Sequence, residues 1–177
     1  MAIAIVATVG ASNANSFCSE AEAVSYAATR LNAPSGWTTF EGTTCTESEK
    51  KALIEAQRDI NVMMFHGNRT ATDQALAWPR YSAPNPDSYD YFDSTEIPQR
   101  VKDAQCELAW QYIKAGTTDL ASMDATRGVI QEVVGPLSTT WESGASRPTG
   151  LARTPRVQAL LKPLLSGSAN SLRVVRG

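Results

Sequence analysis

The side chains that could do catalytic chemistry are few and scattered along this chain. Its single histidine, His66, lies beside Gly67, and an acid–base catalyst needs a positioned partner. No phosphate-binding glycine loop, dinucleotide-binding fingerprint, zinc-protease motif or serine-hydrolase motif occurs. We therefore predict a protein that is not an enzyme and has no catalytic residue. An enzymatic alternative would depend on the acids Asp87, Asp90 and Asp93.

The cysteines also argue against a metal site. Cys18, Cys45 and Cys106 are an odd number and include no Cys-x-x-Cys pair and no Cys/His pairing. A disulfide framework or a zinc site is therefore not expected, and we predict neither a metal nor a cofactor. This cysteine usage fits synthesis in a reducing cytosol.

One aromatic stretch is expected to hold the fold. A proline disfavours helical geometry in the residue before it, so the segment ending in Trp78 and Pro79 should be extended. An extended segment would direct Leu76 and Trp78 to the same side. Burial of a tryptophan contributes about 2–3 kcal/mol. We predict that Trp78, Pro79 and Arg80 are structural residues and do not bind a substrate.

A second aromatic cluster, Tyr89–Asp93, lies in the polar loop from Tyr81 to Glu96. Its acids and aromatics could form a ligand site. We favour the alternative, an exposed turn with a few anchoring side chains.

Charge is distributed unevenly along the 177 residues. Residues 1–142 carry 10 Lys/Arg and 18 Asp/Glu, a net charge of −8, whereas residues 143–177 carry six basic residues and no acid, a net charge of +6. Such a tail can bind nucleic acid or the acidic body of a neighbouring copy. We favour a neighbouring copy, because the basic residues are not interleaved with aromatics.

No apolar run approaches the roughly 20 residues that cross a bilayer, so a membrane protein is not expected. The apolar N-terminus has no basic residue before it, unlike a secretory signal, and reads as a short strand or extended arm.

Apolar periodicity, capping signals and breakers predict the elements. Helices are expected at Ala21–Leu31, Glu47–Phe65, Pro98–Ala115 and Pro155–Leu165. Ser19 with Glu22 and Thr46 with Glu49 have capping-box spacing, Gly67 is a candidate helix C-cap, and Pro163 falls inside the last helix.

Strands are expected at Val129–Val134 and Leu137–Trp141, on either side of Gly135-Pro136. We predict a mainly α fold, a small helical bundle with an inserted β-hairpin at about 128–142 and extended N- and C-terminal arms. Residues 1–142 would form the helical domain, and residues 143–177 a linker, short helix and basic tail.

Several segments in the same order resemble a family of tailed-phage proteins labelled DnaT-like single-stranded-DNA-binding proteins, close to the head-to-tail connectors or adaptors. The matching segments are Asn13–Phe17 with Glu20–Ala23 and Tyr26, Ala52–Ala56, Phe65–Gly67, Gln74–Arg80, Ile97–Pro98 with Ala104–Ala109, and Val134–Leu137.

The resemblance implies a structural virion protein, made in the host cytoplasm, that forms a homo-oligomeric ring of twelve copies. The ring would join the portal protein to a tail or head-completion protein, with genomic DNA passing non-specifically through its lumen. The alternative is a single-stranded-DNA-binding protein.

On the adaptor reading, residues of the hairpin and the tail contact neighbouring subunits, the portal or the tail. They are Val129, Val133, Val134, Leu137, Trp141, Arg153, Arg156, Arg173 and Arg176. Deletion of Arg153–Gly177 is predicted to leave a soluble monomer that no longer joins capsids.

Overall fold

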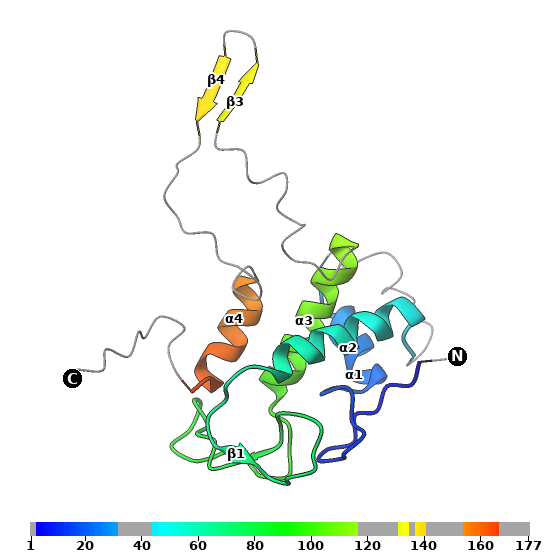
Figure 1. Ribbon diagram of the computed structural model, residues 1–177, viewed down its shortest axis with the longest axis vertical. Helices are drawn as coiled ribbons and strands as arrows, with labels where there is room; N and C mark the ends of the chain where they lie inside the picture. Colours follow the sequence, from blue (N-terminus) through cyan, green and yellow to red (C-terminus); the bar gives the residue numbers. More distant parts are fainter. Residues whose placement is uncertain (1–2, 32–43, 117–130, 135–136, 141–153, 167–177) are drawn as a thin grey trace, which may run out of the picture.

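The computed structural model describes residues 3–31, 44–116, 131–134, 137–140 and 154–166. Within these ranges the chain is mainly helical with a β-hairpin, β3–β4, as predicted, and has a second small antiparallel sheet, β1–β2, that was not predicted (Figure 1). The elements in order are α1 (Glu20–Ala28), α2 (Glu47–Asn61), β1 (Asn68–Arg69), β2 (Arg80–Tyr81), α3 (Gln99–Ala115), β3 (Gln131–Val134), β4 (Leu137–Thr140), α4 (Pro155–Leu161) and the 3-10 helix η3 (Lys162–Leu164).

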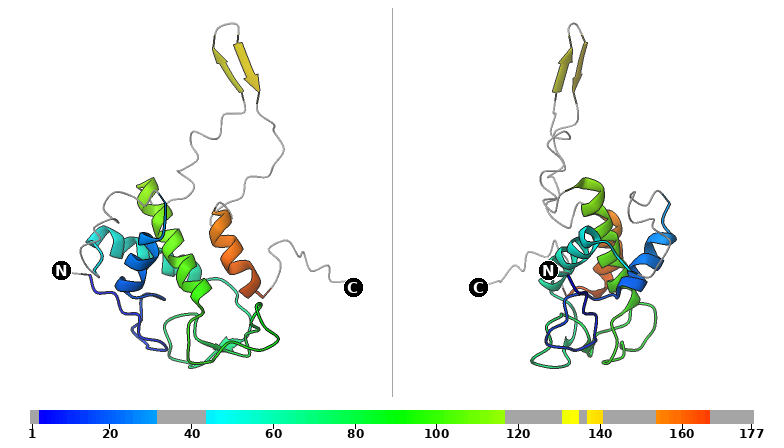
Figure 2. Two further views of the ribbon diagram at one scale, coloured as in Figure 1. Left: turned by 180° about the vertical axis from the view of Figure 1, so that it is seen from behind. Right: turned by 90° about the vertical axis from the view of Figure 1, so that its right-hand side faces the viewer.

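Helix α3 is the centre of the helical body. It contacts α1 and α2 on one side and α4 on the other (Figures 1 and 2). The predicted apolar face is buried, and Trp110 on another side of the helix is buried as well. A helix that is apolar on more than one face must be covered from more than one direction. Here α1, α2 and α4 of the same chain all contact α3, and the Arg30 guanidinium, just after α1, lies 5.5 Å from the Trp110 ring centroid.

Local sequence signals account for where the first two helices begin. The Ser19 and Thr46 hydroxyls accept hydrogen bonds from the backbone N–H groups of Glu22 and Glu49, and the two carboxylates accept in return from the cap residues. Both predicted capping boxes are thus confirmed. Each satisfies two donors that the first helical turn leaves unpaired, and a cap of this kind is worth about 1 kcal/mol.

The short helix α4 is stable only because it packs on the body. Pro155 occupies its first turn, where a missing N–H costs nothing, and Pro163 ends the α-helical hydrogen bonding, so the chain continues as η3. Val157, Leu161 and Leu164 are buried in the core shared with α3. Beyond them, Leu165 forms an antiparallel bridge with Phe65.

Three predicted helix ends are wrong. Helix α1 ends at Ala28 instead of Leu31, α2 ends at Asn61 instead of Phe65, and α4 ends at Leu161 instead of Leu165. Gly67 is therefore not a helix C-cap. It has a φ of +72°, and a Cβ there would lie 2.4 Å from the Tyr81 carbonyl oxygen. The close passage of β2, which pairs Asn68 with Tyr81, requires the glycine.

The predicted hairpin is present at β3 and β4. These strands pair in the register Gln131↔Thr140 to Val134↔Leu137. The hairpin stands away from the helices in every view (Figures 1 and 2). Separately, no helix in the described part of the chain is long and apolar enough to cross a membrane.

The position of α4 changes the expected effect of truncation. Deletion of residues 153–177 removes three buried apolar side chains from the body, each worth about 1.5–3 kcal/mol, against a total stability of about 5–15 kcal/mol. We therefore expect this truncated chain to be largely unfolded, and not the soluble monomer predicted from sequence. Deletion of residues 167–177 is the matched control and should keep the helical circular dichroism and the cooperative urea transition. Equal stability of the two truncated chains would contradict this account.

Candidate nucleic-acid interface

A folded loop at one end of the molecule carries two exposed aromatic side chains, Tyr89 and Tyr91. Residues 82–96 turn back on themselves, with the Asn85 N–H donating to the Asp90 carbonyl at 2.9 Å and the Phe92 N–H to the Ala83 carbonyl at 2.9 Å. Pro84 and Tyr91 form the bridge between these pairs. The loop follows β2 and lies at the end of the body opposite the β3–β4 hairpin (Figure 1).

Aromatic packing fixes this loop to the body. Trp78 is 1% exposed and makes edge-to-face contacts with Phe65 and Phe92, each with ring centroids 5.7 Å apart. Such pairs add about 0.5–1.5 kcal/mol to the burial of the rings. Phe92 is therefore the inward-facing anchor of the Tyr89–Asp93 cluster. The structure thus shows the exposed turn and its anchoring side chain.

Arg80 ties the chain before β1 to the chain around Trp78. Its guanidinium donates to the carbonyls of His66 at 2.7 Å, Ala77 at 3.0 Å and Phe65 at 3.2 Å, and also to that of Gly67. Burial, followed by the charge of nearby Arg69, lowers the pKa of Arg80. The guanidinium group is thus committed to the protein's own backbone.

The structure places Pro79 beside these two residues, in the core. Its carbonyl accepts hydrogen bonds from the Gln74 side chain at 3.1 Å and from the Thr70 N–H at 3.4 Å. Trp78, Pro79 and Arg80 therefore form one structural support beneath the loop.

Three tyrosines point away from this support. Tyr89 is fully exposed, Tyr91 is 62% exposed and Tyr81, on β2, is 48% exposed. Large aromatic side chains bury much apolar area when they are covered, so their exposure together is informative. Exposed aromatic faces can stack on unpaired bases without regard to sequence. We define these three residues as the tyrosine surface.

The charges around the tyrosine surface do not favour a phosphate chain by themselves. Asp87 holds Arg100 in an ion pair, with Arg100 Nε 3.1 Å from Asp87 Oδ2. Asp90 and Asp93 are also exposed, and hydrogen bonds from Thr95 lower the pKa of Asp93. Arg69 is the exposed cation on β1. Attraction of phosphates must therefore come mainly from another part of the chain.

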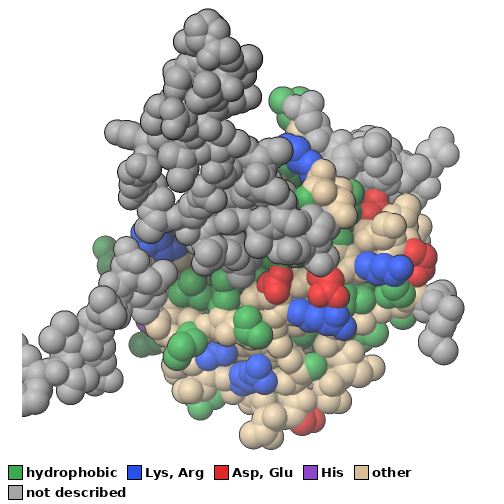
Figure 3. Space-filling view, turned by 45° about the horizontal axis from the view of Figure 1, so that its top comes forward, with side chains coloured by type: hydrophobic (Ala, Val, Ile, Leu, Met, Phe, Trp, Pro, Cys, Tyr) green, Lys and Arg blue, Asp and Glu red, His purple; other side chains and the backbone are tan. Residues whose placement is uncertain are grey.

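The face turned toward the viewer in Figure 3 shows a mixed distribution of charge. Lys and Arg side chains lie among Asp and Glu side chains there, with hydrophobic side chains between them. No broad area of one sign is seen among the described side chains of that face. Nor does any group of three or more His, Cys, Asp or Glu in the described ranges have an arrangement that could hold a metal ion.

Most of the predicted interaction residues lie where no side chain is described. Val133, Val134 and Leu137 occupy β3 and β4, whose backbone pairing alone is described. The predicted residues Val129, Trp141, Arg153, Arg173 and Arg176 lie outside the described residues. Arg156 is on α4, with its Nε 3.7 Å from Glu107 Oε2.

Glu107 is an organising residue that the sequence analysis missed. This carboxylate is 2% exposed on α3 and accepts hydrogen bonds from the Tyr26 hydroxyl at 2.9 Å and Arg30 Nη2 at 3.0 Å. With Arg156 it connects α1, α3 and α4. Burial, followed by this hydrogen bond, raises the pKa of Tyr26 to about 12. The available signal was an acid within the apolar stretch Ala104–Trp110 of a helix.

Gln105, two residues earlier on α3, was also missed by the sequence analysis. Its side chain is completely buried, and its amide connects α3 to the chain that leads into α1. The sequence alone does not indicate the roles of Gln105 and Glu107, because the residues that they bind are far from them along the chain.

Fold and site together define a small, mainly helical protein with an exposed aromatic loop and a basic C-terminal segment. The sequence model of one protein family, described as "Putative DnaT-like ssDNA binding protein", matches residues 1–177, and the chain belongs to that family. No curated protein and no solved structure matches the chain.

Arg80→Lys tests the support beneath the tyrosine surface. A lysine ammonium is a compact charge and cannot reproduce the four-carbonyl geometry of the guanidinium fork. We expect a loss of about 2 kcal/mol in the free energy of unfolding, measured by urea denaturation. Arg69→Lys, at the paired but exposed position of β1, should change it by less than about 0.5 kcal/mol. Similar effects of the two substitutions would show that the carbonyl contacts do not matter.

Proposed function

We propose that this protein binds single-stranded DNA. The observation that carries the proposal is the whole-chain match to a family described as binding single-stranded DNA. Unpaired bases need flat apolar surfaces to stack on, and the phosphates between them need positive charge. The chain supplies these two requirements in different places.

The tyrosine surface is the stacking component of the proposal. Tyr89 and Tyr91 are carried on a loop that is anchored from beneath by Phe92 and Trp78, so the exposed rings are attached to a fixed base. Stacking of a base on an aromatic ring contributes about 1–3 kcal/mol and does not depend on which base is present. We therefore expect binding with little sequence preference.

The basic C-terminal segment is the electrostatic component. The described chain reaches Ser166, whose N–H donates to the Met64 carbonyl at 2.9 Å, while the His66 N–H donates to the Leu164 carbonyl at 3.0 Å. Residues 64–66 lead directly into Gly67 and β1, which pairs with Tyr81. Residues 167–177, with Arg173 and Arg176, follow directly after Ser166, whose position beside Met64 is fixed by its hydrogen bond. Arg173 lies seven residues beyond Ser166, a reach of at most about 25 Å.

Binding of a fluorescein-labelled oligo-dT, followed by anisotropy, tests the stacking component. The double variant Tyr89→Ala, Tyr91→Ala should raise Kd by about 5- to 150-fold for each base that loses its stacking partner. Val62→Ala removes an exposed apolar side chain at the end of α2 and should leave Kd unchanged. Unfolding transitions of both variants should match that of the parent chain, since all three side chains are exposed.

Salt dependence tests the electrostatic component in the same assay. For single strands, the slope of log K against log salt is about −0.7 for each neutralised phosphate. Deletion of residues 167–177 removes Arg173 and Arg176, so it should make the slope less negative by up to about 1.4. If the full chain shows no salt-sensitive binding of oligo-dT, the proposal is wrong. If it binds but neither variant changes the affinity, the assigned surface is wrong.

A second candidate function is a head-to-tail adaptor in a phage virion, and the hairpin favours it. The strands β3 and β4 pair with each other and stand away from the helices, and a lone two-stranded ribbon is marginal in water. A ring would give each ribbon a neighbour, and an acidic body with a basic tail gives two complementary patches for heterologous contacts. We propose that such a ring would bind the portal above and a tail component below, with DNA in its lumen.

Native mass spectrometry of the chain, alone and mixed with a phage portal protein, tests the adaptor function. We expect a monomer alone and a ring-sized assembly only with portal. Replacement of residues 131–140 by a short Gly-Ser linker should abolish assembly without loss of helical circular dichroism, because these strands lie apart from the helices. A full chain that stays monomeric with portal would exclude the adaptor function. A variant that assembles without residues 131–140 would exclude the role of the hairpin.

A further inference from the structure

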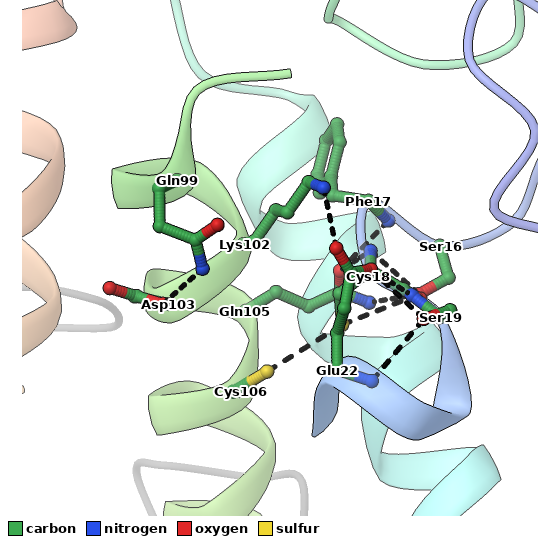
Figure 4. A network of polar contacts seen from close by, with 10 residues as sticks. All are labelled: Ser16, Phe17, Cys18, Ser19, Glu22, Gln99, Lys102, Asp103, Gln105 and Cys106. Carbon is green, nitrogen blue, oxygen red and sulfur yellow. Dashed lines mark hydrogen bonds and ion pairs between the residues drawn. The ribbon is translucent and has the colours of Figure 1, made fainter. Parts of the chain in front are cut away.

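Two cysteines that are far apart in the sequence meet in the core. The Sγ atoms of Cys18 and Cys106 lie 3.5 Å apart, although the residues are 88 positions apart. Both side chains are buried, and neither is in a disulfide. Cys18 lies just before the Ser19 cap of α1, and Cys106 lies on the central helix α3 (Figure 4).

The backbones that carry the two thiols are fixed to each other by the residue next to Cys106. Gln105 Oε1 accepts hydrogen bonds from the N–H groups of Phe17 at 2.8 Å and Cys18 at 3.2 Å. Gln105 Nε2 donates to the Ser16 hydroxyl at 2.9 Å and the Leu53 carbonyl at 2.9 Å. Figure 4 shows this network around the thiol pair. The pair is therefore held together by contacts that do not involve sulfur.

We propose that Cys18 and Cys106 are a dithiol site that is oxidised to an intramolecular disulfide. The co-reactant is a small-molecule disulfide or a peroxide. The two thiols lose two electrons and two protons as the Sγ–Sγ bond forms. A small-molecule disulfide takes them up to give two thiols; hydrogen peroxide takes them up to give two waters, and an alkyl hydroperoxide gives one alcohol and one water. The sulfur atoms approach to about 2.05 Å from their present van der Waals separation.

Cys45 is the third thiol in this region, but its contact differs. Its Sγ donates to the Glu20 carbonyl at 3.8 Å, so it has a partner on α1. We therefore assign the disulfide to Cys18 and Cys106 and expect Cys45 to remain a thiol.

The resting pair reacts slowly with oxidants. The attacking species in disulfide formation is a thiolate, and the hydrogen bond with Cys18 together with burial raises the pKa of Cys106. Oxidant must also reach sulfur atoms that are buried. Reaction therefore follows local opening of the contact between the start of α1 and α3, and the bond once formed prevents that opening.

Diamide oxidation of the purified, reduced full-length chain tests the proposal. We expect the intact mass to fall by about 2 Da, with one peptide pair joining Cys18 to Cys106 in a non-reducing digest. The bond closes a long loop, so the midpoint of thermal unfolding should rise by about 5–15 °C and return on reduction. Diamide itself accepts the two electrons and two protons.

Cys45→Ser is the matched control and should give the same mass change and the same linkage. Cys18→Ala and Cys106→Ala should each abolish both. If either variant does not fold, the peptide map of the parent chain decides the assignment alone. An unchanged mass after prolonged diamide treatment, a linkage through Cys45 or a disulfide between two chains would each overturn the proposal.

Discussion

The buried amide of Gln105 is the contact on which the rest of the helical body depends. An amide offers two donor hydrogens and acceptor lone pairs, and burial without partners would cost about 1–3 kcal/mol for each group. Here both donor and acceptor atoms are used, on Ser16, Phe17, Cys18 and Leu53. One side chain of α3 thereby fixes the chain that leads into α1 and a carbonyl of α2. Glu107, two residues further along α3, does the same toward α1 and α4. The orientation of three helices around α3 is thus set by specific polar contacts as well as by apolar packing.

The other end of the body is organised differently. The contacts around Trp78 are edge-to-face aromatic packing and the hydrogen bonds from Arg80 to backbone carbonyls. Gly67 has no side chain, so the Tyr81 backbone on β2 can pass close to it. Because Phe92 packs on Trp78, the exposed side chains Tyr89 and Tyr91 of loop 82–96 do not contribute to the core. Exposed tyrosines can therefore be changed there without affecting the core. The polar centre at α3 and the aromatic support at Trp78 are separate parts of one core, joined by the chain from α2 to β1 and by the pairing of Phe65 with Leu165.

Features that depend on neighbouring residues were predictable from the sequence. The capping boxes at Ser19 and Thr46, the proline that ends α4 and the apolar faces of α2 and α3 are all local signals. Two predictions failed because they depend on remote segments: the end of α2 and the role of Gly67 beside Tyr81. The polar partners of Gln105 and Glu107 were missed for the same reason. The sequence showed Tyr89–Asp93 as an aromatic cluster. Tyr89 and Tyr91 are exposed because Phe92 is the ring of this cluster that packs on Trp78. The hairpin residues and most basic tail residues of the predicted interface stay predictions, because their side chains lie outside the described part.

A separation of stacking groups from positive charge constrains any account of DNA binding by this chain. Residues 143–177 contain six basic residues and no aromatic, whereas the tyrosine surface is surrounded by Asp87, Asp90 and Asp93. Aromatics without charge would bind bases weakly, and charge without aromatics would bind duplex and single strand alike. Preference for single strands therefore requires both components to act on one ligand. The hydrogen bond from the Ser166 N–H to the Met64 carbonyl fixes the point from which residues 167–177 start, beside the chain between α2 and β1. The packing of α4 on α3 thus determines where the basic tail, residues 167–177, starts. On the proposed function, loss of this packing would separate the basic residues of the tail from the tyrosines.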